Sequence, residues 1–251
     1  MTRAVLALLA LSAVAPAPPP KPATERVVPF RVGETLTYDV SWSDALAAGT
    51  AVATVKEKKP SFNSTAYYVV VEGRPSPLLS AIYPVYYKID ALIDSYTLLS
   101  QRGTVYSEEG RRHRFRVIQF DRPGKRARFE SQLDTTSTSE LAVPPLTQDT
   151  LSAIYALRAR SFKIGERLSV PLADNGMNYT VQIQVEATER VRTAIGEISA
   201  WRLSPSVRDD SNQPVGRGLA IWLSDDGRRL PVQLRAELPV GNFSLLLRDA
   251  R

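Results

Sequence analysis

The sequence predicts a mainly β protein: one large, antiparallel, strongly curved sheet or incomplete barrel with two short covering helices. Two observations carry this prediction. Apolar and polar residues alternate with period two through most of the chain after Pro29, whereas only two stretches show helical spacing. The connections are short, so successive strands are expected to pair in order. A single antiparallel sheet must bury one face, and we expect the helices to cover its apolar concave face.

The clearest strand covers residues 177–187, where apolar side chains such as Val181 and Ile183 occupy every second position. A polar segment at 134–145, which includes Pro144 and Pro145, is predicted to be a loop. Further strands are predicted at residues 31–42, 49–57, 66–72, 86–95, 98–107, 114–121, 127–132, 190–193, 197–204, 218–224, 229–238 and 244–248.

Two segments carry helix signals. Residues 76–83 begin with a serine that can cap a helix, followed by Pro77 at the first helical position. Residues 149–160 begin with Asp149 as the N-cap, and they place Leu151 and Tyr155 on one face. Arg158 lies near the end of this second helix, where the helix dipole favours a cation.

The segment 221–234 contains two adjacent acids and two adjacent arginines, Asp225-Asp226-Gly227-Arg228-Arg229. Alternating apolar residues flank it on both sides, and Asp-Gly between two such runs is a strong hairpin signal. We therefore predict a hairpin turn whose charged side chains face water, and neither a reactive cluster nor a cation site.

The N-terminus has a basic residue, a short apolar run and an Ala-x-Ala pattern, which predict a secretory signal peptide at residues 1–17. A proline-rich spacer follows at 18–28, and residues 29–251 are predicted to form a single β-rich domain. The expected location is the periplasm or the extracellular space, and the processed chain is not expected to span a membrane.

Composition argues against several chemistries. The chain has no cysteine and a single histidine, so thiol chemistry and multi-histidine metal sites are excluded. That histidine, His113, stands among arginines without an adjacent carboxylate in its segment, which disfavours a serine-hydrolase triad. Asp90 and Asp94 could form the carboxylate pair of a glycosidase, but Lys88 lies on the same strand face, which is typical of an ordinary solvated face. We predict no catalytic residue, no metal, no cofactor and, with bases and acids interleaved at a net charge of +6, no nucleic-acid partner.

Several motifs occur in an order that resembles a known family: Gly33-Glu34, the segment 149–158, Gly165, Gly196 and the segment 221–231. Together they resemble the exported bacterial proteins catalogued as domain of unknown function 3108. The resemblance covers nearly everything from Pro29 to Leu247. It implies an envelope location and a β-rich fold, and it supplies no established reaction and no catalytic residues.

Two functions remain open from the sequence. The first is a non-enzymatic binding or carrier protein whose concave face holds a lipid or another amphipathic molecule. The second is a structural or interaction module with a filled core that contacts another envelope protein. The predicted ligand-contacting residues are Leu79, Tyr83, Tyr155, Arg158 and Trp222.

Two sets of arginines carry open alternatives. Arg158, beside Tyr155 on the helix, is predicted to need either a buried salt-bridge partner or an anionic ligand. Arg114 and Arg116 lie in a basic strand that could contact an anionic head group. The alternative for this strand is an outward-facing charged strand that protects a sheet edge.

Overall fold

The computed structural model describes residues 24–43, 46–82, 84–133, 135–238 and 241–251. The predicted signal peptide and residues 18–23 of the spacer lie outside these ranges. Within them, 15 strands form one antiparallel sheet, accompanied by two helices, α1 (Pro77–Ile82) and α2 (Thr150–Arg158). The predicted fold class is therefore confirmed. The strands are β1 (Thr35–Trp42), β2 (Leu46–Ser61), β3 (Ser64–Pro75), β4 (Val85–Asp94), β5 (Ser100–Glu109), β6 (Arg112–Asp121), β7 (Arg126–Gln132), β8 (Thr136–Ala142), β9 (Arg167–Asp174), β10 (Met177–Thr193), β11 (Gly196–Asp209), β12 (Pro214–Val215), β13 (Arg217–Ser224), β14 (Pro231–Leu238) and β15 (Gly241–Ala250).

The strand order explains why the sheet is open. Strands β1 to β8 pair in sequence, β9 to β15 lead back, and β15 pairs with β1, so that the order runs from β8 through β1 to β9. The two edge strands, β8 and β9, are therefore consecutive in the chain and are linked through α2. Side chains bring the two edges together: Ala173 of β9 lies in an apolar cluster against which Leu141 of β8 packs, and the Asn178 amide of β10 donates to the Ala142 carbonyl of β8 at 2.9 Å. Among the described residues no ladder joins them, and the curved sheet stays open at this seam.

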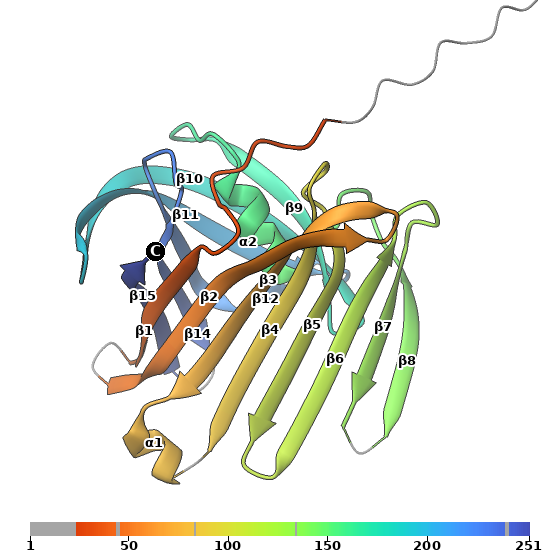
Figure 1. The fold of residues 1–251 in the computed structure, drawn as a ribbon, viewed down its shortest axis with the longest axis horizontal. Helices are drawn as coiled ribbons and strands as arrows, with labels where there is room; N and C mark the ends of the chain where they lie inside the picture. Colours follow the sequence, from red (N-terminus) through yellow and green to blue (C-terminus); the bar gives the residue numbers. More distant parts are fainter. Residues whose placement is uncertain (1–23, 44–45, 83, 134, 239–240) are drawn as a thin grey trace, which may run out of the picture.

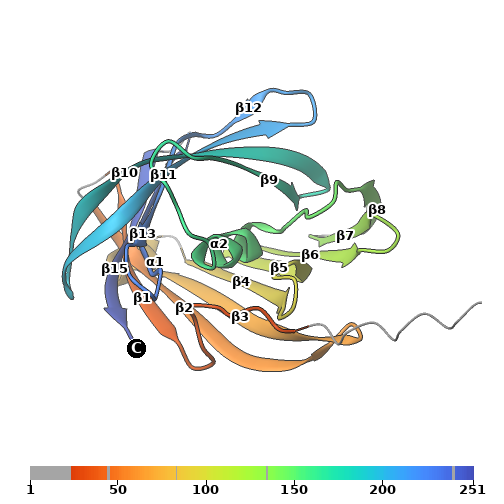
Figure 2. The same cartoon turned by 90° about the horizontal axis from the view of Figure 1, so that it is seen from above.

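Helix α2 lies inside the curve of the sheet, between β9–β10 on one side and β3–β5 on the other (Figure 2). The segment before it is fastened to both walls. The Gln148 side chain accepts from Ser100 N and donates to Leu98 O, while its backbone pairs with β9 at Pro171 and Ala173. Arg122 donates to the carbonyls of Ser100 and Thr147. These bonds fix the helix within the concavity.

Helix α1 occupies a different place. It contacts β2 and β3 at the end of the sheet that is lowest in Figure 1. Its N-cap is the predicted one, because Leu79 N donates to Ser76 Oγ. The first helix therefore stands at the rim of the concavity, and the second fills its interior.

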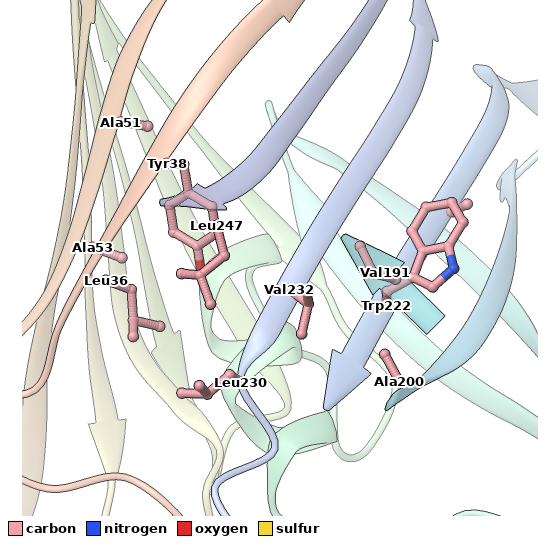
Figure 3. Close-up of a cluster of buried hydrophobic side chains, with 11 residues drawn as sticks. Leu36, Tyr38, Ala51, Ala53, Val191, Ala200, Trp222, Leu230, Val232 and Leu247 are labelled. Carbon is pink, nitrogen blue, oxygen red and sulfur yellow. The ribbon is translucent and has the colours of Figure 1, made fainter. Parts of the chain in front are cut away.

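The core follows the alternation. On the concave face of β1, Leu36 and Tyr38 pack with Leu247 of β15, while Trp222 lies apart beside Val191 and Ala200 (Figure 3). A second cluster joins α2 to the sheet, with Leu151 and Tyr155 packed against Val69, Ala91 and Phe30. The predicted apolar face of α2 is thus the face that is buried.

Three local predictions need correction. The segment predicted as a polar loop contains strand β8, whose residues are almost all exposed, so that an edge strand with both faces wet shows no alternation. Strand β9 was not predicted at all. The separate strands predicted at 177–187 and 190–193 are one strand, β10, with a bulge between Val185 and Ala187 that shifts the register.

The N-cap of α2 carries a buried charge. The Asp149 carboxylate accepts from Ser152 N at 2.9 Å and from Ser152 Oγ at 2.6 Å. Burial nevertheless raises the pKa of Asp149, with the hydrogen bonds from Ser100 and Ser152 acting against that rise. When the pKa of a carboxyl is higher in the folded than in the unfolded protein, the free energy of unfolding falls as pH rises from the unfolded pKa through the folded pKa.

We therefore expect D149N to be more stable than the native protein at pH 7, because asparagine keeps the capping oxygen without the charge. The difference should shrink as pH falls toward the ordinary aspartate pKa of about 3.9. Urea unfolding followed by circular dichroism between these pH values measures it. D149A, which lacks the acceptor, should lie ~1 kcal/mol below D149N throughout. A native protein more stable than D149N at pH 7 would contradict the expectation.

Candidate ligand-binding cavity

The concave face of the sheet is filled at one end and hollow at the other. Helix α2 occupies the end near Phe30 and Ala91. Toward the opposite end, the same face of β1 continues with Val40 and Trp42, which line a cavity of about 710 Å³. This volume falls within the range of about 300–1,000 Å³ usual for small-molecule sites. The cavity lining comes from six strands and α1 and includes Gly49, Thr50, Gly73, Pro75, Leu79, Val85, Tyr87, Glu109 and Phe243.

Register explains why the lining is apolar. Residues paired across antiparallel strands lie on the same face. Val40 pairs with Leu245 of β15 and Trp42 with Phe243, while Gly73 of β3 pairs with Tyr87 of β4. The rings of Trp42 and Phe243 are nearly parallel, with centroids 6.2 Å apart. Alternation that buries the core at one end therefore presents an aromatic and aliphatic wall at the other.

Small residues keep the wall thin. A Cβ added at Gly73 would meet the Tyr87 Cβ at 3.7 Å, an ordinary contact, so a larger side chain would extend into open space. Gly49 is different, because a Cβ there would lie 2.1 Å from the carbonyl oxygen of Arg74. Gly49 is thus required by close strand packing, and Gly73 contributes to the hollow.

A second cavity of about 300 Å³ adjoins the first through their shared residue Tyr87. It lies between α2 and strands β4–β7 and is lined by Ile89, Ile118, Phe129 and Leu151. Arg116 also lines it and donates to Asn175 Oδ1 at 3.4 Å, across to the turn between β9 and β10. The Tyr87 hydroxyl donates to Glu109 Oε1 at 2.6 Å, which places one polar group where the two cavities meet.

Arg158 takes the salt-bridge alternative. Its guanidinium bonds Glu34 in a bidentate pair, with Nη1–Oε1 at 2.6 Å and Nη2–Oε2 at 2.9 Å. The two side chains are 0% and 5% exposed. Arg158 also donates to the carbonyls of Arg228 and Arg229, and its guanidinium lies 5.0 Å from the ring centroid of Tyr155. It is a structural group, walled off from both cavities.

The other residues predicted to contact a ligand do not lie together in the structure. Leu79 lines the larger cavity. Tyr155 is buried in the core, where its ring meets Phe30 edge to face at 4.9 Å, and burial raises its pKa to about 12. Tyr83 lies outside the described residues. Arg116 lines the smaller cavity. Arg114 lies on the same face of β6, because it pairs with Ser107 while Arg116 pairs with Val105, two residues away on β5.

Trp222 belongs to the opposite face of the sheet. Trp222 pairs with Gln233 of β14, Gln233 pairs with Leu246 of β15, and Leu246 pairs with Asp39 of β1. Paired residues share a face, and Asp39 lies on the face of β1 opposite to Val40, so Trp222 faces away from the concavity. There Trp222 borders a separate, polar cavity of about 700 Å³ under the far half of β10. Its Nε1 donates to Glu189, and Arg202 and Arg235 lie over its ring at 5.7 and 5.5 Å. The structure does not bring Trp222 together with Leu79.

The predicted hairpin at Asp225–Arg229 is confirmed, since β13 pairs with β14 around it. Its charges are not all directed to water, however. Asp226 accepts from Ser224 Oγ and from the backbone N–H groups of Arg228 and Arg229. Arg229 is partly buried, because it bonds Asp225 and lies over the Phe162 ring. The turn is therefore a packed element.

Two expectations about charged side chains were incomplete. The pairing of β5 with β6 sets Glu108 opposite His113, so a carboxylate does lie 3.9 Å from that ring. The histidine side chain is nevertheless 61% exposed. Asp94 is buried rather than solvated and accepts from Tyr96 N, Thr97 N and Gln101, which together fasten the turn after β4.

Comparison with known proteins places the chain in a family. The family model described as Protein of unknown function (DUF3108) matches residues 37–248. The chain belongs to this family. No curated protein matches the sequence. The part of the chain that the structure describes contains no helix long and apolar enough to cross a membrane.

Solved structures with a similar course of the chain exist. A β-barrel-like protein of domain of unknown function DUF1849 from Brucella abortus matches with a TM-score of 0.59 and 10% identity, over 91% of this chain and 99% of that chain. A candidate lipoprotein from Parabacteroides distasonis matches over 91% of this chain and 100% of its own, with a TM-score of only 0.37 and 7% identity. The first similarity supports the fold alone.

The buried ion pair yields a prediction about stability. We expect E34Q to lose about 3–5 kcal/mol of unfolding free energy, because it leaves the Arg158 charge buried without its partner. The double variant E34M/R158M, which removes both charges, should lose less than E34Q, since no uncompensated charge remains. Urea unfolding of the native protein, E34Q, E34M, R158M and the double variant E34M/R158M measures the coupling. Strictly additive losses would show that the pair does not act as a unit.

Proposed function

We propose that this protein is a non-enzymatic binding protein of the cell envelope that holds an amphipathic molecule in the concavity of its open sheet. The observation that carries the proposal is the apolar cavity of about 710 Å³ behind Trp42, Leu79 and Phe243. A cavity of this size and lining is the usual form of a small-molecule site. The envelope location rests on the N-terminal sequence pattern and the family.

The cavity's position supports a reversible binder. One end of the concavity is filled by α2 and held by the Arg158–Glu34 pair, so ligand exchange need not disturb the core. The hollow end lies at the rim, next to α1. A ligand entering there meets an already formed wall, which limits the conformational entropy that binding costs.

The alternative, an interaction module whose core is filled, is favoured less. A filled core would place a large side chain where the lining has Gly73, which has room for one. Apolar side chains such as Trp42 would be expected to contact one another across the concavity, leaving no such volume. The cavity is the feature that distinguishes the two functions, and it supports the binding protein.

The experiment uses 12-bromododecanol, a neutral amphiphile whose bromine quenches tryptophan fluorescence at short range. Trp42 lines the cavity, whereas Trp201 and Trp222 line neither of the two adjoining cavities. We expect saturable quenching of the native protein that is abolished in W42F. Native mass spectrometry of protein purified from its own host, with lipid extraction, identifies the natural ligand class. Absence of quenching together with a clean unliganded mass would refute the proposal.

A matched pair of variants tests the wall. L79D places a charge on the cavity side of α1, and we expect it to weaken 12-bromododecanol binding by about tenfold or more, or ~1.4 kcal/mol. L78D changes the neighbouring residue of the same helix, whose side chain is 67% exposed, and should bind like the native protein. Equal losses in both variants would mean that the helix was disturbed rather than the wall. Equal binding in both would remove Leu79 from the site.

A further inference from the structure

Three arginines of β6 face the same side of the sheet as the cavity. Glu109 pairs with Arg112, Ser107 with Arg114 and Val105 with Arg116. On the neighbouring pair of strands, Val85 pairs with Glu109, and Ile89 with Val105. Because paired residues share a face, the arginines stand on the concave side, in line with the cavity wall. The outward-facing alternative for this strand is therefore excluded.

The three guanidinium groups lack carboxylate partners. Some exposed arginines elsewhere in the sheet are paired, such as Arg126 with Glu140 and Arg248 with Asp39, whereas exposed Arg128 and Arg192 have no carboxylate within ion-pair distance among the described residues. In the described ranges no carboxylate lies within ion-pair distance of any of the three β6 arginines. Arg116 has a neutral partner, Asn175, and its Nε is buried without a hydrogen bond.

Acids also lie on this side of the sheet: Glu109 stands opposite Arg112, and Asp90, Asp149 and Asp174 line the smaller cavity with Arg116. Glu109 accepts a hydrogen bond from the Tyr87 hydroxyl, and Asp149 is the buried cap of α2. Asp174 lines the smaller cavity with Arg116 without pairing to it. Side chains two residues apart on a strand lie roughly 7 Å from each other, so the like charges repel. An anion placed between them would relieve that repulsion and satisfy donors that have no partner.

We infer that the ligand carries an anionic head group, which Arg114 and Arg116 bind while the apolar tail lies against the wall of Trp42 and Leu79. This inference rests on the proposed function and concerns the same site. Tyr87 joins the two regions, because it lines both cavities. Arg114 is exposed and Arg116 half-buried, which sets the head group beside solvent. A guanidinium binds carboxylate and phosphate oxygens alike in bidentate geometry.

The test compares 12-bromododecanoate with 12-bromododecanol, which differ only in the head group. We expect the native protein to bind the anionic probe about tenfold more tightly at low salt, with the preference reduced at high salt. R114Q/R116Q should lose the preference and keep the affinity for the neutral probe. Dodecyl phosphate and dodecanoate, as competitors, distinguish the two anionic head-group chemistries.

The matched control is R126Q/R128Q. It removes the same two charges from the adjacent strand, at exposed positions on the outer face, and should retain the preference. Equal affinity of the native protein for both probes, or a preference that survives R114Q/R116Q, would overturn the inference while leaving the proposed function standing. If neither probe binds, the proposed function fails and the inference fails with it. Equal loss of preference in R126Q/R128Q would reduce the effect to net charge and would also overturn it.

Discussion

The buried pair of Arg158 and Glu34 joins three parts of the chain that are far apart in sequence. Glu34 precedes the first strand, Arg158 ends the interior helix, and the carbonyls of Arg228 and Arg229 belong to the turn between β13 and β14. A charge pair removed from water is tolerable only when its remaining donors are satisfied, and here the turn supplies those acceptors. Three of the motifs that mark the family resemblance, Gly33-Glu34, the α2 segment and the 221–231 segment, therefore meet at one point. Their common role is to hold the helix inside the sheet.

The same constraint creates the hollow. The chain passes from one edge of the sheet, β8, to the other, β9, through the concavity, so that α2 takes the place of the pairing that would close the seam. A helix of nine residues fills only part of the interior. What lies beyond it is an apolar wall without a partner element, formed by strands whose alternation is set by the core at the other end. The cavity is thus a consequence of where the interior helix ends.

Much of this architecture could be predicted from the sequence, and the failures have physical causes. Alternation located most strands, and the capping residues Ser76 and Asp149 located both helices. Strand β8 was not predicted because a strand that is exposed on both faces shows no alternation of apolar and polar residues. The need of Arg158 for a partner was foreseen, but Glu34 lies 124 positions away, and no local pattern pairs them. The sequence grouped Trp222 with Leu79, but Trp222 lies on the outer face of β13. The far half of β10 covers that outer face, so β13 carries apolar residues on both faces and the sequence does not show which face points into the concavity. For Arg114 and Arg116 the sequence allowed either face, since β6 carries charges on both.

The division of the interior also explains how the proposed binding site can coexist with a stable fold. The filled half contains the ion pair, the capped helix and the best-packed apolar residues, including Val55, Val69 and Leu203 at 0% exposure. The hollow half is lined by strand residues that hydrogen-bond into the same continuous sheet, so its backbone is held without a packed interior. Enlarging Gly73 would improve packing there at the cost of the cavity, because an added Cβ meets only ordinary contacts. Under the proposed function, the space left open beside Gly73 is where the apolar part of the ligand would pack, because the strands already hold the wall in place.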